Sequence, residues 1–321
     1  MKRYIIIFGM ALLALASCEK EIPFEDVDEE IKIVVNGIQK VGEPARLSVE
    51  KSSFYIETQK DHRVKDVEVD LFVNGEFKEA LQVRDSMTYY NVEWYGTDEI
   101  TQELEYGFTY CEGSYLLCEG DELRFEVSSS EFDDVAVAEI TMPLAPEVIG
   151  FDTIHIQYSE DHTYYTASFQ LKIKDPVGAD YYNLDPQGAL DGFVTKDPVF
   201  QDLMNIVNVD DLFGGSEYYA RKGYNPFSDA YFDGKEYSIT MSVDHYGAEF
   251  YEPFTLLVSR VDQHLFQYRK TLNAYEQTDQ GSLLGMFMEP VQVYSNVQNG
   301  IGVVCAQSRP VVLTIDLTTN E

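Results

Sequence analysis

The sequence predicts a mainly β protein made of two β-sandwich, immunoglobulin-like domains, the second with a packed α-helix near residues 260–276. Three observations favour this fold class. Many short segments alternate apolar and polar residues, which is typical of strands with one buried face. Asn-Gly and Asp-Gly dipeptides, which favour tight turns, separate several of these segments. The 321 residues include 23 Tyr and 19 Phe, and aromatic residues favour strands.

Length and proline placement predict two domains. A chain of 321 residues is long enough for two cores of about 150 residues each. Pro143 and Pro146 mark a boundary between them. We therefore expect an N-terminal β-sandwich domain over 31–146 and a C-terminal β-rich domain with one helix over 147–321.

Alternating segments predict the strands of the N-terminal domain. The segment VKDVEVDLFVNGEFKEAL (64–81) turns at Asn74-Gly75, which is a strong hairpin signal. The segment IKIVVNGIQ (31–39) is expected to end in a turn at Asn36-Gly37. The predicted strand segments of this domain are 31–39, 45–52, 64–81, 114–130 and 135–143.

The C-terminal domain is predicted to contain further strands and the helix. Apolar residues recur at intervals of four and three near 260–276, as on one face of an α-helix. These residues are Val261, Leu265, Tyr268, Leu272 and Tyr275. Residues 199–207 could form a second, short helix. The predicted strand segments are 147–159, 164–176, 175–186, 232–244, 253–261, 289–299, 302–308 and 309–317.

The N-terminus has the layout of a secretory signal peptide. Lys2 and Arg3 precede an apolar run over 4–16, which is shorter than the about 20 residues that a membrane-spanning helix needs. The tetrapeptide Leu15-Ala16-Ser17-Cys18 resembles the lipobox of bacterial lipoproteins, in which the cysteine receives a diacylglycerol and becomes the new N-terminus. The alternative is an ordinary secretory signal in which Cys18 is incidental.

The lipobox resemblance implies a signal peptide over 1–17 and a covalent N-acyl diacylglycerol on Cys18, detectable by palmitate labelling. Acyl chains would anchor the protein to a membrane without a spanning helix. Residues 18–30 form an acidic tether, which resembles the export signal of Bacteroidota surface lipoproteins. That resemblance implies the outer membrane, with the protein facing the cell exterior. The alternative is a merely solvated linker.

The formal net charge is −33. Such a charge argues against nucleic acid as a partner because phosphates would be repelled. It also disfavours contact with anionic lipid surfaces. Divalent cations could offset part of the charge, but charge alone does not place them. We expect no cofactor besides the acyl groups on Cys18.

Three cysteines remain after Cys18 is set aside. Cys111 and Cys118 are seven positions apart, and a hairpin through residues 112–114 could bring them together. In an exported protein either a disulfide or two free thiols is possible. Cys305 is expected to be a buried thiol. The sequence contains no Cys-x-x-Cys pair and no His/Cys cluster, so it does not predict a zinc site.

Aromatic residues crowd the segment TYYNVEWYGTDEI (88–100). Tyr89, Tyr90, Trp94 and Tyr95 lie in what reads as a polar loop, and exposed aromatics contribute strongly to ligand binding. They are therefore the first candidate for a ligand-facing group. The alternative is that they belong to the core of a long hairpin. The pair Tyr218-Tyr219 is the next candidate.

Two acidic loops are candidate calcium or sugar sites, Asp175-Pro176-x-Gly178 and Asp229-x-x-x-Asp233-Gly234. Neither has the ligand spacing of an EF-hand, so we expect ordinary Asp-Gly turns and no metal. The stretch from Ser295 to Gly302 could be a ligand loop. We favour a turn in which Asn296 bonds the backbone and glycine supplies positive φ.

The sequence contains no G-x-S-x-G, H-E-x-x-H or P-loop motif. Carboxylates are so abundant that no glycosidase-like pair can be singled out. We therefore expect no catalytic activity.

A set of motifs in a fixed order resembles the Bacteroidota lipoprotein family catalogued as domain of unknown function 4249. The chain departs from the family at Glu119-Gly120-Asp121, where Pro-Gly is more usual, and after Gly302, where an aromatic-Gly pair is common. The motifs span nearly the whole chain after Cys18. They are IVVNG, VKDVEVDLFVNGEF, YLLCEGDELRFEVS, KDPVGADYYNL, DAYFDGKEYSI, SRVDQHLFQYRKTLN and EPVQVYSNVQNGIGVV.

The family carries no established activity, and the resemblance implies an association with TonB-dependent outer-membrane transporters. The expected function is therefore a non-catalytic surface lipoprotein that serves as an accessory or binding subunit of such a transport system. Two alternatives stay open. One is a structural or adhesive, fimbrilin-like surface protein, and the other is a surface hydrolase for glycans or peptides.

Overall fold

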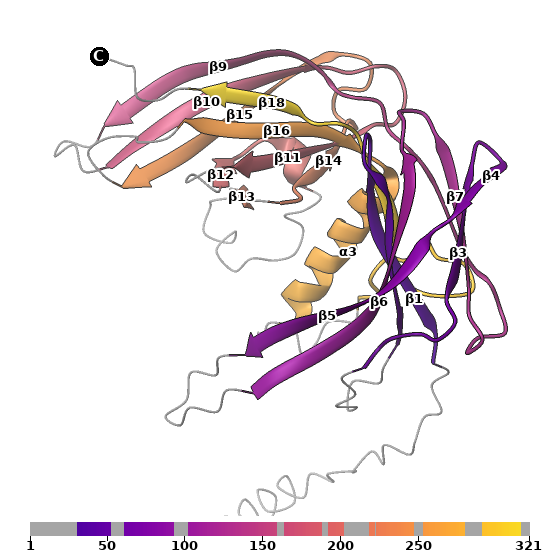
Figure 1. The fold of residues 1–321 in the computed structure, drawn as a ribbon. Coiled ribbons are helices and arrows are strands. Elements are labelled where there is room, and N and C mark those ends of the chain that lie inside the picture. The colour runs from indigo at the N-terminus through magenta and orange to yellow at the C-terminus, as the bar shows by residue number, and fades with distance from the viewer. Residues whose placement is uncertain are drawn as a thin grey trace, which may run out of the picture. The chain divides into compact units, whose positions relative to one another are not determined.

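The computed structural model describes most of the chain from residue 31 onward. The described residues are 31–52, 61–92, 102–158, 164–187, 192–201, 218–221, 223–246, 253–279 and 291–315. They form strands β1 to β18, the short 3-10 helix η1 and the α-helix α3 (Figure 1). The chain from Lys32 onward makes one compact unit.

The elements before the predicted domain boundary are all strands. They are β1 (Ile33–Lys40), β2 (Pro44–Lys51), β3 (Glu68–Val73), β4 (Glu76–Ala80), β5 (Gln82–Val92), β6 (Gln102–Leu116), β7 (Glu122–Ser128) and β8 (Ala136–Thr141).

After that boundary, the described residues include one α-helix among the strands. The elements are β9 (Glu147–Tyr158), β10 (Tyr164–Lys174), β11 (Tyr181–Gln187), β12 (Gly192–Thr195), η1 (Pro198–Phe200), β13 (Tyr218–Arg221), β14 (Pro226–Ser228), β15 (Glu236–Tyr246), β16 (Phe254–Val261), α3 (Gln263–Asp279), β17 (Val304–Gln307) and β18 (Val311–Ile315).

The described strands form three sheets. A nine-stranded sheet has the order β14-β11-β16-β17-β1-β2-β6-β5, with β18 paired to β16. A five-stranded sheet has the order β13-β12-β15-β10-β9, and a four-stranded sheet has the order β4-β3-β7-β8. The largest sheet therefore contains strands from both sides of the predicted boundary. The predicted mainly β fold is confirmed, whereas the domain limits and the immunoglobulin-like topology stay predictions.

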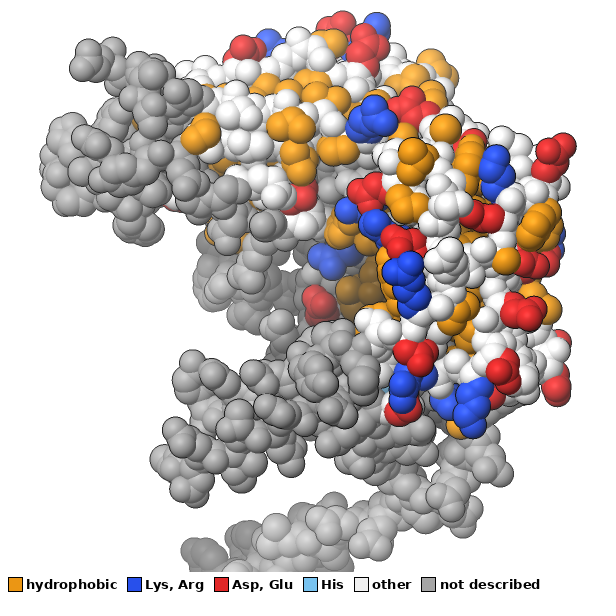
Figure 2. All heavy atoms as spheres, viewed as in Figure 1, with side chains coloured by type: hydrophobic (Ala, Val, Ile, Leu, Met, Phe, Trp, Pro, Cys, Tyr) orange, Lys and Arg blue, Asp and Glu red, His pale blue; other side chains and the backbone are white. Residues whose placement is uncertain are grey.

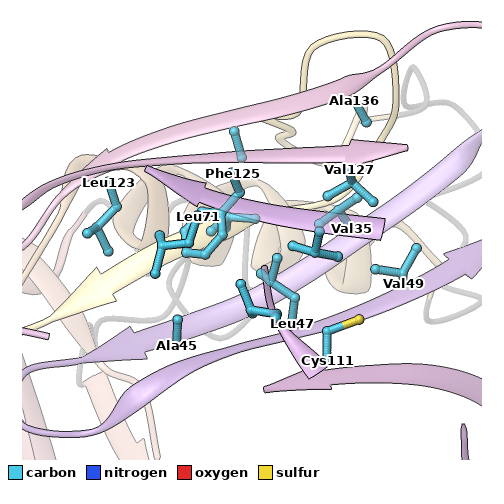
Figure 3. Close-up of a cluster of buried hydrophobic side chains, with 14 of the residues drawn as sticks. Val35, Ala45, Leu47, Val49, Leu71, Cys111, Leu123, Phe125, Val127 and Ala136 are labelled. Carbon is cyan, nitrogen blue, oxygen red and sulfur yellow. The ribbon is translucent and has the colours of Figure 1, made fainter. Parts of the chain in front are cut away.

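Two large apolar clusters fill the space between the sheets. The first cluster joins inward-facing residues of β1, β2 and β6 to those of β3, β7 and β8, and Figure 3 shows these side chains converging. Among its fully buried members are Val35, Leu47, Leu71, Cys111 and Phe125. The alternation of buried and exposed positions along β3 and β7 matches the period of two that the sequence shows.

The second cluster lies between the five-stranded sheet and the strands β11, β14 and β16. It is rich in aromatic rings, which stack on one another at centroid distances such as 5.0 Å for Phe169 and Phe254. A third, small cluster contains Val261, Leu265 and Cys305 and packs beside α3.

The helix predicted near 260–276 is present as α3. Leu265 is buried as expected, and Tyr268 and Leu272 are half-buried, but Tyr275 is 44% exposed. The helix contacts β17 and β14. Of the residues predicted to form a short helix over 199–207, the described ones include only the end of η1.

Strand β1 changes partners halfway along its length. Its first half pairs antiparallel with β2, from Ile33 to Asn36, and its second half pairs parallel with β17, from Gly37 to Lys40. Beyond Asn36 the side chain of Gln39 continues the bonding to β2. Its amide donates to the carbonyl of Arg46 at 2.8 Å and accepts from the N–H of Arg46 at 3.1 Å. Gln39 is only 1% exposed. Its side-chain amide takes the place of a backbone partner and satisfies the buried carbonyl and N–H of Arg46.

This change of partners explains why the predicted turn at Asn36-Gly37 is wrong. The strand continues to Lys40 because β17 supplies a partner exactly where β2 diverges. A Cβ at Gly37 would lie 2.5 Å from the carbonyl oxygen of Arg46, so the strands cross too closely for any side chain. The Asn74-Gly75 hairpin, in contrast, is confirmed, with φ of 54° and 82° at the two residues.

Two further expectations are wrong. Residues 291–297 of the predicted strand 289–299 are not a strand, and their bonds are isolated ones: the N–H of Tyr294 donates to the hydroxyl of Thr271 at 2.8 Å and that of Asn296 to the carbonyl of Gly302 at 3.3 Å. The hairpin expected between Cys111 and Cys118 is also absent, since β6 runs unbroken to Leu116. Five extended residues from Cys111 span about 16 Å, far beyond the reach of a disulfide. Both thiols are free, Cys111 buried and Cys118 exposed.

Gly302 is expected to be essential to the junction between β1 and β17. Its φ is +117°, and a Cβ there would lie 2.2 Å from the carbonyl oxygen of Val35. Gly302→Ala should lower the free energy of unfolding by about 3 kcal/mol, measured by urea denaturation.

Gly223→Ala is the matched control, because Gly223 has the same φ of +117° but no atom within 4 Å of its Cβ position. Equal losses of stability in the two variants would show that the close approach to Val35 is unimportant.

Candidate functional site

Two acidic loops meet at one end of the second cluster. The first loop, 175–180, follows β10 and leads into β11. The second loop, 229–235, follows β14 and leads into β15. The sequence predicts two separate Asp-Gly turns, but the structure brings Asp175, Asp229 and Asp233 together, with one carboxylate oxygen of each within 4.8 Å of the others.

Hydrogen bonds join these loops to each other. Asp175 accepts a bond from the backbone N–H of Gly234 at 2.8 Å, and Asp233 accepts one from Gly178 at 2.9 Å. Asp229 accepts a third from the N–H of Asp180 at 2.9 Å. Each carboxylate thus caps the backbone of the opposite loop.

Positive φ angles allow these contacts. Gly234 has a φ of 69° and Gly178 a φ of 136°, both in the region that glycine occupies without strain. The predicted turn chemistry is therefore correct, although the pairing of the two loops could not be anticipated from it.

The phenol of Tyr182 makes a further hydrogen bond to these carboxylates. It is fully buried and donates a 2.5 Å hydrogen bond to the other oxygen of Asp175. Arg260 lies beside this ring, 6.0 Å from its centroid, and forms an ion pair with Asp180. Burial lowers the pKa of Arg260, and the nearby charge of Asp175 opposes that shift.

The negative charges of the three carboxylates where the two acidic loops meet are not balanced. Asp229 is 5% exposed, and its pKa is raised to about 6, first by burial and then by the negative charges of Asp175 and Asp233. Near neutral pH the folded state therefore holds an ionised carboxylate in an unfavourable place.

Three convergent carboxylates are donors of the kind that Ca²⁺ prefers. Ca²⁺ takes six to eight oxygens, however, and four of the six oxygens here already accept hydrogen bonds from the protein. The arrangement is fully explained as a latch between two loops, which we call the acidic latch (Asp175, Asp229 and Asp233).

A second group of titratable side chains surrounds the N-terminus of α3. Asp262 accepts the N–H of Leu265 at 3.0 Å, while its other oxygen, Oδ2, is buried and has no partner among the described residues. Burial raises the pKa of Asp262 to about 7. His264 Nδ1 lies 2.7 Å from the hydroxyl of Tyr294, and burial lowers the pKa of this histidine.

Cys305 lies close to this group, but its environment is the opposite of an activated nucleophile. The thiol is 1% exposed, and burial together with the charge of Asp262 raises its pKa. Reactive cysteines have a lowered pKa and an accessible sulfur. The prediction that Cys305 is a buried thiol is correct.

The Ser295–Gly302 stretch contains the predicted turn. The side chain of Asn296 donates to the carbonyl of Val304 at 2.7 Å and accepts from its N–H at 3.0 Å. Gly302 supplies the positive φ that was expected. Here the sequence interpretation agrees with the contacts.

The aromatic candidates are only partly visible. Tyr89 and Tyr90 lie in β5, which pairs with β6 in one long hairpin, so their backbone is a strand and not the expected loop. Their side chains, and all of Trp94 and Tyr95, lie outside the described residues. Cys18 and the tether over 18–30 also lie outside them. In the part of the chain that is described, no helix is long and apolar enough to cross a membrane.

The sequence pattern of the family described as Domain of unknown function (DUF4249) matches residues 19–310. Among curated proteins, none matches the chain.

The acidic latch predicts a pH-dependent gain in stability for Asp229→Asn. Because the pKa of Asp229 is raised, the protonated carboxyl stabilises the folded state. This contribution to the free energy of unfolding is complete below about pH 4 and is lost as the pH rises through about 6. The asparagine keeps the acceptor for Asp180 but never ionises. The variant should therefore unfold at higher urea than wild type at pH 8, and this gain should shrink towards pH 4.5.

Asp134→Asn serves as the control, because Asp134 is an exposed loop residue remote from these carboxylates. A gain for Asp229→Asn that is equal at both pH values would mean that charge repulsion is not its cause.

Proposed function

The chain belongs to the DUF4249 family, and from this premise we propose that it is a lipid-anchored outer-membrane lipoprotein facing the cell exterior. The observation that carries the proposal is the Leu15–Cys18 lipobox followed at once by an acidic tether. Cys18 would bear the acyl groups, and the β-sheet body after residue 31 would stand outside the membrane.

In this proposal the protein acts without catalysis, as an accessory or binding subunit of a TonB-dependent transport system. Two features support a binding role. The lipobox and tether would hold the chain where such transporters open to the exterior. The described titratable groups are used structurally, since the acidic latch caps backbone N–H groups and Asp262 caps a helix. The formal charge of −33 argues against nucleic acid as the partner.

The surface that Figure 2 draws carries charged side chains of both signs, interspersed among uncharged ones. Among the described surface ion pairs, Arg46 on β2 binds Glu112 on the neighbouring strand β6 and Glu43 in the turn before β2. Such a mixed surface keeps a protein soluble at high local concentration. It fits a protein that projects from a membrane.

Lipidation at Cys18 is tested by metabolic labelling with palmitate. Wild type should incorporate the label and sediment with membranes. Cys18→Ala should lose the label and appear in the soluble fraction, because the only acylation site is gone. Cys118→Ala is the control, since Cys118 is exposed but lies far from the lipobox. Membrane association that persists unchanged in Cys18→Ala would contradict the anchor.

The transporter partnership is tested by affinity purification from native membranes in mild detergent. We expect an outer-membrane transporter to be enriched at least about tenfold over a control. The control is residues 1–30 fused to an unrelated β-sandwich, which keeps the anchor and tether but lacks the body. Recovery of no transporter, or equal recovery with the control, would count against this function.

A further inference from the structure

The outer face of the five-stranded sheet carries a groove of about 510 Å³. Its floor includes Ser168 on β10 and Thr240 and Ser242 on β15, and Lys196 and Asp197 form one wall. This volume is within the range of about 300–1,000 Å³ that is usual for ligand sites. The groove is distinct from the acidic latch and from the group around Asp262.

Strand register places five outward side chains in one row across this sheet. Directly opposite residues of antiparallel strands point to the same face. The pairs are His155 with Ser168, Ser168 with Ser242, Ser242 with Val194, and Val194 with Tyr219. With strands about 4.8 Å apart, the row is about 19 Å long. Ser168, Ser242 and Val194 of this row line the groove, and Tyr219 is the next residue along the row, directly opposite Val194.

The floor offers unused hydrogen-bonding capacity. The hydroxyls of Ser168 and Ser242 are half-buried and have no partner among the described residues. The neighbouring Thr195 differs, since its hydroxyl donates to the carbonyl of Thr240 at 2.7 Å. A serine hydroxyl can donate one hydrogen bond and accept two. Ser168 and Ser242 therefore place donors and acceptors side by side on the floor of the groove.

Tyr219 provides an aromatic surface at one end of the row. It is 56% exposed, and its ring lies across Gly192 on the neighbouring strand. A Cβ at Gly192 would be 3.1 Å from the phenol oxygen and 3.2 Å from the adjacent ring carbon. The glycine therefore makes room for the phenol end of this exposed ring beside the sheet.

The chemistry of the groove selects one class of ligand. Lys196 and Asp197 carry opposite charges, so the wall is neutral in a chain whose net charge is −33. A single lysine is a poor match for phosphate or nucleic acid. A peptide cannot add as a strand, because β10 and β15 already pair along their whole length. Hydroxyls on a flat floor beside an aromatic face complement a sugar, which has hydroxyls around an apolar ring face.

We propose that this groove binds a neutral oligosaccharide, with Ser168 and Ser242 bonding sugar hydroxyls and Tyr219 stacking on one ring. This role does not depend on a transporter partner. It requires only the described sheet, so it can be tested with the purified chain.

Isothermal titration of the full mature chain in a sugar-free detergent tests the proposal. The probes are the neutral hexasaccharides maltohexaose, xylohexaose and mannohexaose, together with an anionic oligogalacturonate. At least one neutral probe should bind with a Kd below about 1 mM, and the anionic probe should not bind. Ser168→Ala with Ser242→Ala should weaken binding about tenfold, and Tyr219→Ala about fivefold.

Ser238→Ala is the matched control, because Ser238 is an exposed serine on β15 with the same outward orientation but outside the groove. Its affinity should stay within twofold of wild type. Thermal unfolding should confirm that each variant is folded. If the double variant is unfolded, the single alanine variants give the same comparison with smaller effects.

Three results would overturn the proposal. The first is that no neutral probe binds. The second is that binding is unchanged in the folded serine variants, which would place the ligand elsewhere. The third is that only the anionic probe binds, because the groove offers a single lysine against its carboxylates.

Discussion

The architecture depends on the parallel pairing of β1 with β17. Strand β1 bonds to β2 along its first half and to β17 along its second, so one strand belongs to both parts of the nine-stranded sheet. The N–H of Val303 also bonds the side chain of Asn36 at 2.9 Å across 267 positions of sequence. Removing this contact would leave two partial sheets. Gly302 permits it because a Cβ there would lie 2.2 Å from the carbonyl oxygen of Val35, and Gly37 lets the neighbouring strand β2 pass closely beside β1.

How far the sequence predicts the structure depends on whether the signal is local. The Asn74-Gly75 hairpin and the alternating strands beside it follow from neighbouring residues alone. Asn36-Gly37 has the same dipeptide but lies inside a strand, because a partner from the far end of the chain pairs with it. The mainly β class and the position of the helix were therefore predictable. The strand partners were not predictable. Strands that are far apart in the sequence pair through long loops, and a short sequence pattern does not indicate which strands these are.

The candidate sites also combine locally predictable turns with long-range contacts that the sequence does not predict. Both acidic loops are visible in the sequence as turns, yet Asp175 and Asp229 are brought together only by the packing of β10, β11 and β15. Each carboxylate there satisfies a backbone N–H, Asp121 does the same in the loop before β7, and Glu79 accepts the N–H of Ser114 near the end of β6. Part of the large acidic content is thus used inside the fold, where it replaces hydrogen bonds that irregular backbone would otherwise lack. Of the five residues in the row across the five-stranded sheet, only Tyr219 was a candidate from the sequence, because the row's members come from five different strands.

The late position of β17 has a consequence for the order in which the protein folds. During synthesis from the N-terminus, β1 is complete long before Val304 is added. Until then the second half of β1 has no parallel partner, and the large sheet stays open at its centre. The sheet closes only when almost the whole polypeptide has been made, and a product truncated before residue 304 lacks the strand that unites its two halves.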